Sequence, residues 1–204
     1  MRTWTDQEFE NEEFDAETFR EVAPIKIDRC RFIACSFSEL RLDELETHRC
    51  EFNECKFDGA RLASSRHFGT SFLNCDFTGA DCFGATFEKC RLVGSVFELT
   101  RLDAIRIVEG DWSYTILRMQ DLSRLDLSGV NFRRADLYSS DLRASNLRDA
   151  NLKGANLGLA KLQKADLRGA DLSEVDLRTT ELKGTRMTLD QAALFAMCFG
   201  IILE

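Results

Sequence analysis

The chain has 204 residues and a formal net charge of −8, with 44% apolar and 30% charged residues. This composition excludes an intrinsically disordered chain, and no apolar run approaches the roughly 20 residues that cross a bilayer. The length suits one domain with a continuous core. Residues 1–21 are acidic and lack the apolar stretch of a secretory signal, so we expect a cytoplasmic protein without membrane contact.

The N-terminal segment places four aromatic side chains at intervals of five residues, from Trp4 to Phe19, and carries eight acidic residues against two arginines. The next apolar side chain of the series, Ile27, follows after eight residues instead of five. Pro24, the single proline, lies in this gap. We expect a register break near residues 20–26, with a bulge or short loop of about three extra residues; a loop that contacts a partner is the alternative.

From Ile27 to Met187 an apolar residue stands at every fifth position, with Thr47, His67 and Cys82 as the exceptions. Five residues turn an α-helix through about 500°, so these side chains would face every direction on a helix. In a flat strand they would alternate between the two sides. The spacing therefore predicts a chain that turns a corner in every repeat and coils about its own axis, which is a solenoid.

The middle of the chain shows the repeat most clearly, as in Ala135-Asp136-Leu137, Ala150-Asn151-Leu152 and Ala165-Asp166-Leu167. This A(D/N)LXX pattern resembles the pentapeptide-repeat family over nearly the whole chain. The resemblance implies an all-β solenoid, a right-handed quadrilateral parallel β-helix with four pentapeptides per coil. Residues 20 apart would then stack directly, and the repeats would make roughly nine coils and a rod of about 44 Å. Apart from the register break, we expect an uninterrupted coil in the domain of residues 1–187.

Each position of the repeat has a physical role. The centre residue and the small residue two before it would point inward. Asp or Asn before the centre can bond its own nearby backbone, and Gly two residues after the centre suits a corner with positive φ. Six cysteines occupy the small position, so we expect buried thiols; their C-x4-C spacing is the repeat length and not that of a zinc site. These cysteines are Cys30, Cys35, Cys50, Cys55, Cys75 and Cys90.

The sequence offers no catalytic residues, no metal ligands and no cofactor site. Of the two histidines, His48 and His67, the second occupies a centre position that stacks on Thr47, so we expect an internal hydrogen-bonded side chain. No phosphate-binding glycine loop is present. A filled solenoid core would also leave no cavity for a substrate. We therefore expect a protein that is not an enzyme.

Residues 188–204 follow the last repeat and predict a short α-helix. Thr188 and Gln191 fit a capping box, and Gly200 is suited to the C-terminal stop. The helix is apolar all round, so both sides need cover. One side would plug the solenoid and the other would meet a twofold-related copy, giving a homodimeric rod of about 90 Å; a monomer with a capping helix is the alternative. The plugging side is Leu194, Phe195 and Cys198, and the dimer side is Leu189, Ala193, Met197 and Gly200.

The acidic charge is uneven along and around the predicted rod. The coil body is neutral overall, and the excess lies at the N-terminal segment and on one of four faces. Such a surface repels phosphates, so we expect no direct binding of nucleic acid and instead a partner that itself holds DNA; solubilising charges are the alternative. The acids of this face are Glu39, Asp58, Asp76, Glu98, Asp136 and Asp176, opposed by Lys56, Arg118 and Arg178.

The aromatic opening from Trp4 to Phe14, the segment 92–97 and the ending at 190–193 resemble the MfpA and Qnr group of this family. That resemblance implies a DNA-mimicking homodimer that binds DNA gyrase through GyrA or GyrB, inhibits supercoiling and protects gyrase from fluoroquinolones. Two alternatives stay open. One is immunity of gyrase against a natural toxin, and the other is a scaffold or adaptor for another protein.

Overall fold

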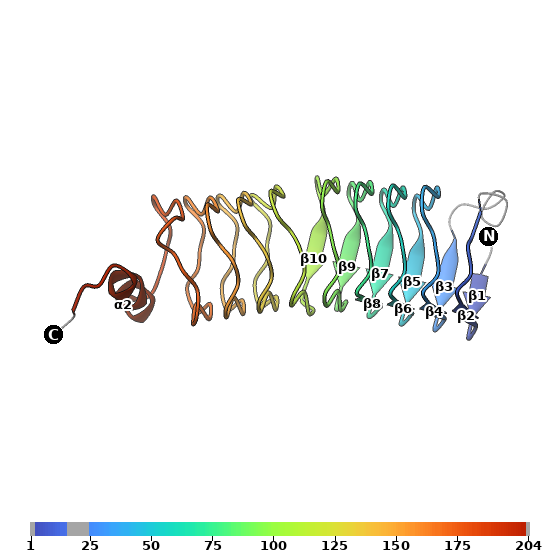
Figure 1. Cartoon of the computed structure of the whole chain (residues 1–204), viewed down its shortest axis with the longest axis horizontal. Coiled ribbons are helices and arrows are strands. Elements are labelled where there is room, and N and C mark those ends of the chain that lie inside the picture. The colour runs from blue at the N-terminus through green and yellow to red at the C-terminus, as the bar shows by residue number, and fades with distance from the viewer. Residues whose placement is uncertain (1–2, 16–24, 203–204) are drawn as a thin grey trace.

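The computed structural model describes residues 3–15 and 25–202, which form a rod of stacked coils (Figure 1). The N-terminal strands lie at one end of the rod, and the helix α2 lies at the other. The predicted right-handed quadrilateral parallel β-helix with a short C-terminal helix is thus confirmed. Phe19 and Pro24 lie outside the described residues, so the expected loop there stays a prediction.

Two parallel sheets form two faces of the N-terminal half. One has the order β1-β3-β5-β7-β9-β10 and the other the order β2-β4-β6-β8. Elsewhere the coils are joined by single parallel bridges, because the chain turns too often to leave longer extended stretches. The strands are β1 (Thr3–Thr5), β2 (Glu8–Glu10), β3 (Lys26–Asp28), β4 (Arg31–Ile33), β5 (Glu46–His48), β6 (Glu51–Asn53), β7 (Arg66–Phe68), β8 (Ser71–Leu73), β9 (Thr86–Glu88) and β10 (Arg106–Val108).

The pairing register confirms the predicted stacking of residues 20 apart, with Thr47 opposite His67 in strands β5 and β7. The first coil differs, because Trp4 lies opposite Ile27, an offset three residues longer. This longer offset confirms the three extra residues that the sequence predicted between the first coil and the second.

The core consists of columns of like side chains that run along the rod. Phe37, Phe57 and Phe77 stack face to face with ring centroids 4.8 and 4.9 Å apart. Phe52 of the adjacent column meets Phe57 edge to face at 5.4 Å. Leucines replace most of these rings in the C-terminal half, where side chains such as that of Leu142 are fully buried. Each such burial contributes roughly 1.5–3 kcal/mol, so the rod is stabilised along its whole length.

The corners follow the predicted turn chemistry. The amide of Ser123 donates to the carboxylate of Asp121 at 2.9 Å, so the residue before the centre Leu122 bonds the backbone two residues later. Every glycine that the sequence placed at a corner has positive φ, for example Gly129 at 68°. The aspartates of the repeats are therefore turn residues, and they do not converge on one site.

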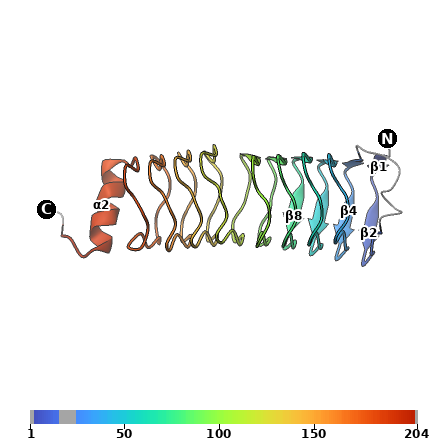
Figure 2. The same ribbon diagram turned by 90° about the horizontal axis from the view of Figure 1, so that it is seen from above.

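Helix α2 (Leu189–Cys198) lies across the end of the rod (Figure 2). The predicted capping box is present, since the Thr188 hydroxyl accepts from the Gln191 amide and the Gln191 side chain accepts from the Thr188 amide. The same glutamine side chain donates to the carbonyls of Leu167 and Ala170 at 2.6 and 2.8 Å. Gln191 therefore caps both the helix and the last turns of the solenoid. Gly200, at φ 74°, follows the end of the helix as predicted.

The side of α2 that faces the rod differs in part from the prediction. Phe195 packs against the core as expected. Leu194 is 46% exposed, so its assignment to the plugging side was wrong; it lies with the outward residues Leu189 and Met197. Ala193, assigned to the outward side, is half-buried. The inward face of the helix is thus the one that carries Gln191 and Phe195, because the Gln191 cap turns this face toward the last coil.

The prediction of an uninterrupted coil was also wrong at one place. No backbone hydrogen bond joins residues 101–109 to residues 121–128, both of which the structure describes. The opposite side of the same two coils is intact, as Leu117 donates to the carbonyl of Asp136 at 2.8 Å. The two coils therefore diverge as a wedge, although the five-residue spacing of the sequence continues through it.

Candidate partner-binding surfaces

The six acids predicted for partner binding lie along one face of the rod. Parallel bridges run along this face from Ser36 to Asn156, with Asp76 and Asp136 in the same column. Asp76 and Asp136 belong to single bridges, and the other four acids lie at corners or in irregular backbone; the carboxylates stand at the surface, exposed or half-buried.

Arginines of the same face neutralise two of these acids. Arg118 Nε lies 2.5 Å from Asp136 Oδ2, and Arg178 Nη2 lies 2.6 Å from Asp176 Oδ2. The hydrogen bonds from the Arg178 side chain and amide hold the pKa of Asp176 at about 2, well below its usual range. The C-terminal half of this face therefore presents paired charges instead of a continuous acidic line.

The remaining acids lie in the N-terminal half. Ser38 Oγ donates to Asp58 at 2.5 Å, and the Thr78 amide donates to Asp76 at 2.9 Å. Within residues 3–15 and 25–202, none of these remaining acids forms an ion pair. They form a shorter surface, here called the acidic segment, which consists of Glu39, Asp58, Asp76 and Glu98.

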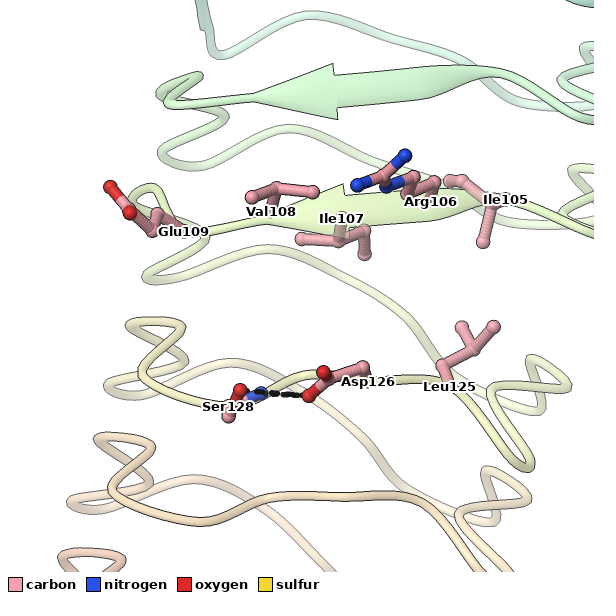
Figure 3. Close-up of a pocket in the computed structure, with 8 residues that line it drawn as sticks. All are labelled: Ile105, Arg106, Ile107, Val108, Glu109, Leu125, Asp126 and Ser128. Carbon is pink, nitrogen blue, oxygen red and sulfur yellow. Dashed lines mark hydrogen bonds between the residues drawn. The ribbon is translucent and has the colours of Figure 1, made fainter.

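The wedge between the diverging coils opens a cavity of about 410 Å³ (Figure 3). Ile105 and Leu125 point toward one another across it, whereas Arg106 points away from Asp126. Ile105 and Leu125 stand in the position that the next coils fill with Ser145 and Ala165. The prediction that the filled core leaves no cavity was therefore wrong here.

Side-chain size alone does not account for the wedge. Ile25 and Leu45 share the same column, and Glu46 nevertheless donates to the carbonyl of Ile25 at 2.9 Å. In that region both coils carry strands, β3 and β5. At the wedge, strand β10 faces a coil that makes a tight turn at Ser128–Gly129 instead. The wedge therefore forms where two conditions are met together: the corner geometry changes between the two coils, and both coils carry a long side chain, Ile105 and Leu125.

Helix α2 presents an apolar outward face. Leu189 and Met197 are 90% and 62% exposed, and Phe199 and Ile202 continue this surface beyond the helix. An exposed apolar patch of this kind is typical of an interaction surface. Of the predicted dimer residues, Leu189 and Met197 are thus available, Gly200 follows at the exposed end, and Ala193 is only partly accessible.

The buried polar groups serve packing. His67 Nδ1 lies 2.8 Å from the Thr47 hydroxyl, and its Nε2 lies 3.0 Å from that of Ser65. Burial raises the pKa of Cys82 and Cys90 to about 12, so their thiols are not nucleophiles at neutral pH. The predicted core thiols are confirmed as buried. Among the described residues, no cluster of His, Cys, Asp or Glu could hold a metal ion.

One surface was missed by the sequence analysis. Four large apolar side chains stand exposed beside the C-terminal continuation of the acidic face. For three of them the signal in the sequence was an apolar residue two positions after the centre, where Gly and polar residues are usual; the fourth, Tyr138, directly follows its centre. We call this surface the apolar ridge; it consists of Leu99, Met119, Tyr138 and Leu159.

Known proteins share both the repeat and the fold. A family model described as pentapeptide repeats matches residues 50–94, 117–149 and 150–188 in eight copies. The pentapeptide repeat protein MfpA of Mycobacterium tuberculosis is 40% identical over 129 residues, which is 63% of this chain. The match spans 58% of the length of that curated relative.

The solved structures support the fold. Full-length QnrB1, a plasmid-mediated fluoroquinolone resistance protein, superposes with a TM-score of 0.61 at 20% identity, over 98% of this chain and 100% of its own. A trypsin-treated variant of QnrB1 gives 0.84 at 21% identity, over 99% and 100% of the two chains. No helix among the described residues is long and apolar enough to cross a membrane. Because the repeat model matches more than half of the residues, the chain belongs to the pentapeptide-repeat family.

Proposed function

We propose that this chain binds DNA gyrase as a non-enzymatic mimic of duplex DNA. In doing so it inhibits supercoiling, protects gyrase from fluoroquinolones or a gyrase-targeting toxin, or does both. The observation that carries the proposal is a rod with a row of unpaired acids on one face, in a chain that is 40% identical to MfpA over 129 residues. The fluoroquinolone resistance of QnrB1, a protein of the same fold, supports the link to gyrase. No cofactor is needed, and the site of action is the cytoplasm, where gyrase works.

The mechanism is occupancy. The rod lies in the DNA-binding saddle of gyrase or beside its ATPase gate, on GyrA or GyrB, and competes with DNA for that place. Coils repeat about every 4.8 Å, whereas duplex DNA carries one charge per roughly 1.7 Å of axis. The acidic segment is therefore a sparse imitation of DNA, and its contacts concentrate in the N-terminal half of the face.

A pair of matched charge reversals tests this assignment. Asp76→Lys with Glu98→Lys removes unpaired acids, whereas Asp136→Lys with Asp176→Lys makes the same change in net charge at acids already paired with arginine. We expect the first pair to abolish inhibition of supercoiling and the second to weaken it far less. Equal effects of the two pairs would show that only net charge matters. Circular dichroism checks that each variant keeps its fold.

We also propose a homodimer through the outward face of α2. Burial of Leu189, Met197 and the apolar residues that follow the helix would remove the largest exposed apolar surface at that end of the rod. Leu189→Glu with Met197→Glu should give a monomer in sedimentation analysis. A wild-type chain that sediments as a monomer would favour the simple capping helix instead.

A supercoiling assay with purified gyrase, with and without ciprofloxacin, tests the function as a whole. Inhibition or protection at micromolar protein is the expected result. If the protein showed neither inhibition nor protection, the result would favour the second candidate, a scaffold or adaptor for another protein. The ion-paired, neutral C-terminal half of the acidic face supports this candidate. A neighbouring antibiotic-synthesis cluster would favour immunity to a toxin over drug resistance.

A further inference from the structure

The apolar ridge gathers at one corner of the rod. Leu99, Met119 and Leu159 belong to a single column of residues 20 apart, and their exposed fractions are 83%, 73% and 50%. The column from Leu99 to Leu159 spans three coil steps, or about 14 Å. Among the described residues with positive φ, these three are the only large aliphatic ones.

Each of these three residues is unfavourable for the fold in two respects. Their φ angles are 55°, 58° and 57° in chain order, a region that Gly and Asn adopt at lower cost than Leu or Met. Their side chains also stay in water, where the apolar surface gains nothing from folding. The rest of the corner positions hold mainly polar residues or Gly. Neither turn formation nor core packing explains the ridge.

Tyr138 completes the ridge and is held in place by a glycine. A Cβ added at Gly158 would lie 3.1 Å from Tyr138 Cδ2, so the ring lies against the bare backbone of the next coil. Gly158 is not a corner residue with positive φ, and an added Cβ would also lie 3.2 Å from Asn156 Oδ1, so both contacts favour a glycine at this position. The ring adds a rigid aromatic surface to the column, of the kind that anchors protein interfaces.

The charges beside the ridge indicate the surface it fits. Glu98 and Asp121 flank the ridge at Leu99 and Met119, and neither acid forms an ion pair within the described residues. The cations beside Leu99 and Met119, Arg101 and Arg118, are already paired with Asp81 and Asp136. At the other end of the ridge, Lys161 follows Leu159 and forms no ion pair within the described residues, so the unpaired acidic charge lies beside Leu99 and Met119. An apolar groove rimmed by basic side chains complements this pattern, and a bare phosphate backbone does not.

We propose that the apolar ridge inserts into a basic-rimmed apolar groove on DNA gyrase, a contact that imitation of DNA does not supply. This inference rests on the proposed function and deepens it, because it divides the interface into an electrostatic part and an apolar part. Contacts of charged groups weaken steeply with salt, whereas the ridge contact keeps its strength. The acidic segment then governs the rate of association with gyrase, and the ridge governs the rate of dissociation.

The test replaces the three aliphatic ridge residues together, as Leu99→Asn, Met119→Asn and Leu159→Asn. Asn is compatible with positive φ, so the melting temperature should equal or exceed that of the wild type. Tyr114→Asn is the matched control, because Tyr114 is also exposed, at 49%, with φ 59° but on another corner. Affinity for purified gyrase is measured at low and high salt by biolayer interferometry.

The triple variant should bind at least tenfold more weakly at every salt concentration, with faster dissociation, while Tyr114→Asn binds like the wild type. Wild-type affinity of the triple variant would overturn the ridge contact and leave the proposed function intact. A wild-type chain that does not bind gyrase would overturn the proposed function and this inference with it. Loss of self-association in the triple variant, with gyrase binding unchanged, would assign the ridge to a second copy and overturn the proposal. If the triple variant does not fold, Met119→Asn alone serves as the test. Its affinity for gyrase should be several-fold weaker than that of the wild type, and wild-type affinity would overturn the ridge contact.

Discussion

His67 should make the rod sensitive to mild acid. The ring is buried between Thr47 and Phe87, in contact with the Thr47 hydroxyl, and burial lowers its pKa from 6.5 to about 3. The unfolded chain therefore takes up a proton below pH 6.5 that the folded chain accepts only near pH 3. Stability from this site is complete above pH 6.5 and falls as the pH decreases. The loss reaches about 2 kcal/mol at pH 5.

The perturbation is His67→Gln, which keeps an amide able to bond the neighbouring hydroxyls and removes the titrating ring. Urea unfolding at pH 7, 6 and 5 gives the free energy of unfolding for both proteins. Carboxylates contribute equally in both and cancel in the comparison. The wild type should lose about 2 kcal/mol more than the variant between pH 7 and pH 5. His48→Gln, at an exposed histidine of the same sheet, is the control and should follow the wild type. Parallel pH profiles for the wild type and His67→Gln would refute the reasoning.

Three further predictions concern the core, the cap and the wedge. Phe57→Ala should cost about 3–5 kcal/mol in urea unfolding, because its ring stacks on rings both before and after it; a loss below 1 kcal/mol would contradict the aromatic column. Gln191→Ala leaves two carbonyls of the last turns unpaired and should cost roughly 1–3 kcal/mol in thermal unfolding; an unchanged melting temperature would show that water replaces the cap. The amide of Ile107, at the wedge, should exchange with solvent much faster than that of Leu117, which bonds the next coil; equal protection in hydrogen exchange would mean that the wedge is closed in solution.

The sequence alone was sufficient for the architecture. A residue that packs inward must recur with the period of the chain path, so the five-residue spacing from Ile27 to Met187 encodes the corners directly. The same logic placed Thr47 opposite His67 and accounted for the longer offset of the first coil. The capping box at Thr188 was equally readable, because its partners are three residues apart.

Features that depend on contacts between coils were not readable in this way. Whether Asp136 carries a free charge depends on the reach of Arg118 in the preceding coil, and the repeat places both on the same face without fixing the pairing. The orientation of α2 depends on carbonyls left open by the last turns, which Gln191 reaches.

The wedge and the ridge make the same point more strongly. Ile105 and Leu125 continue the repeat without an insertion, yet the step between their coils opens because two long side chains meet where the corner geometry changes. The residues of the ridge do not belong to the five-residue apolar series. They lie together only because each coil returns to the same corner. The one-dimensional period therefore determined the fold of this protein, and the tertiary structure decided which of its surfaces are charged, open or apolar.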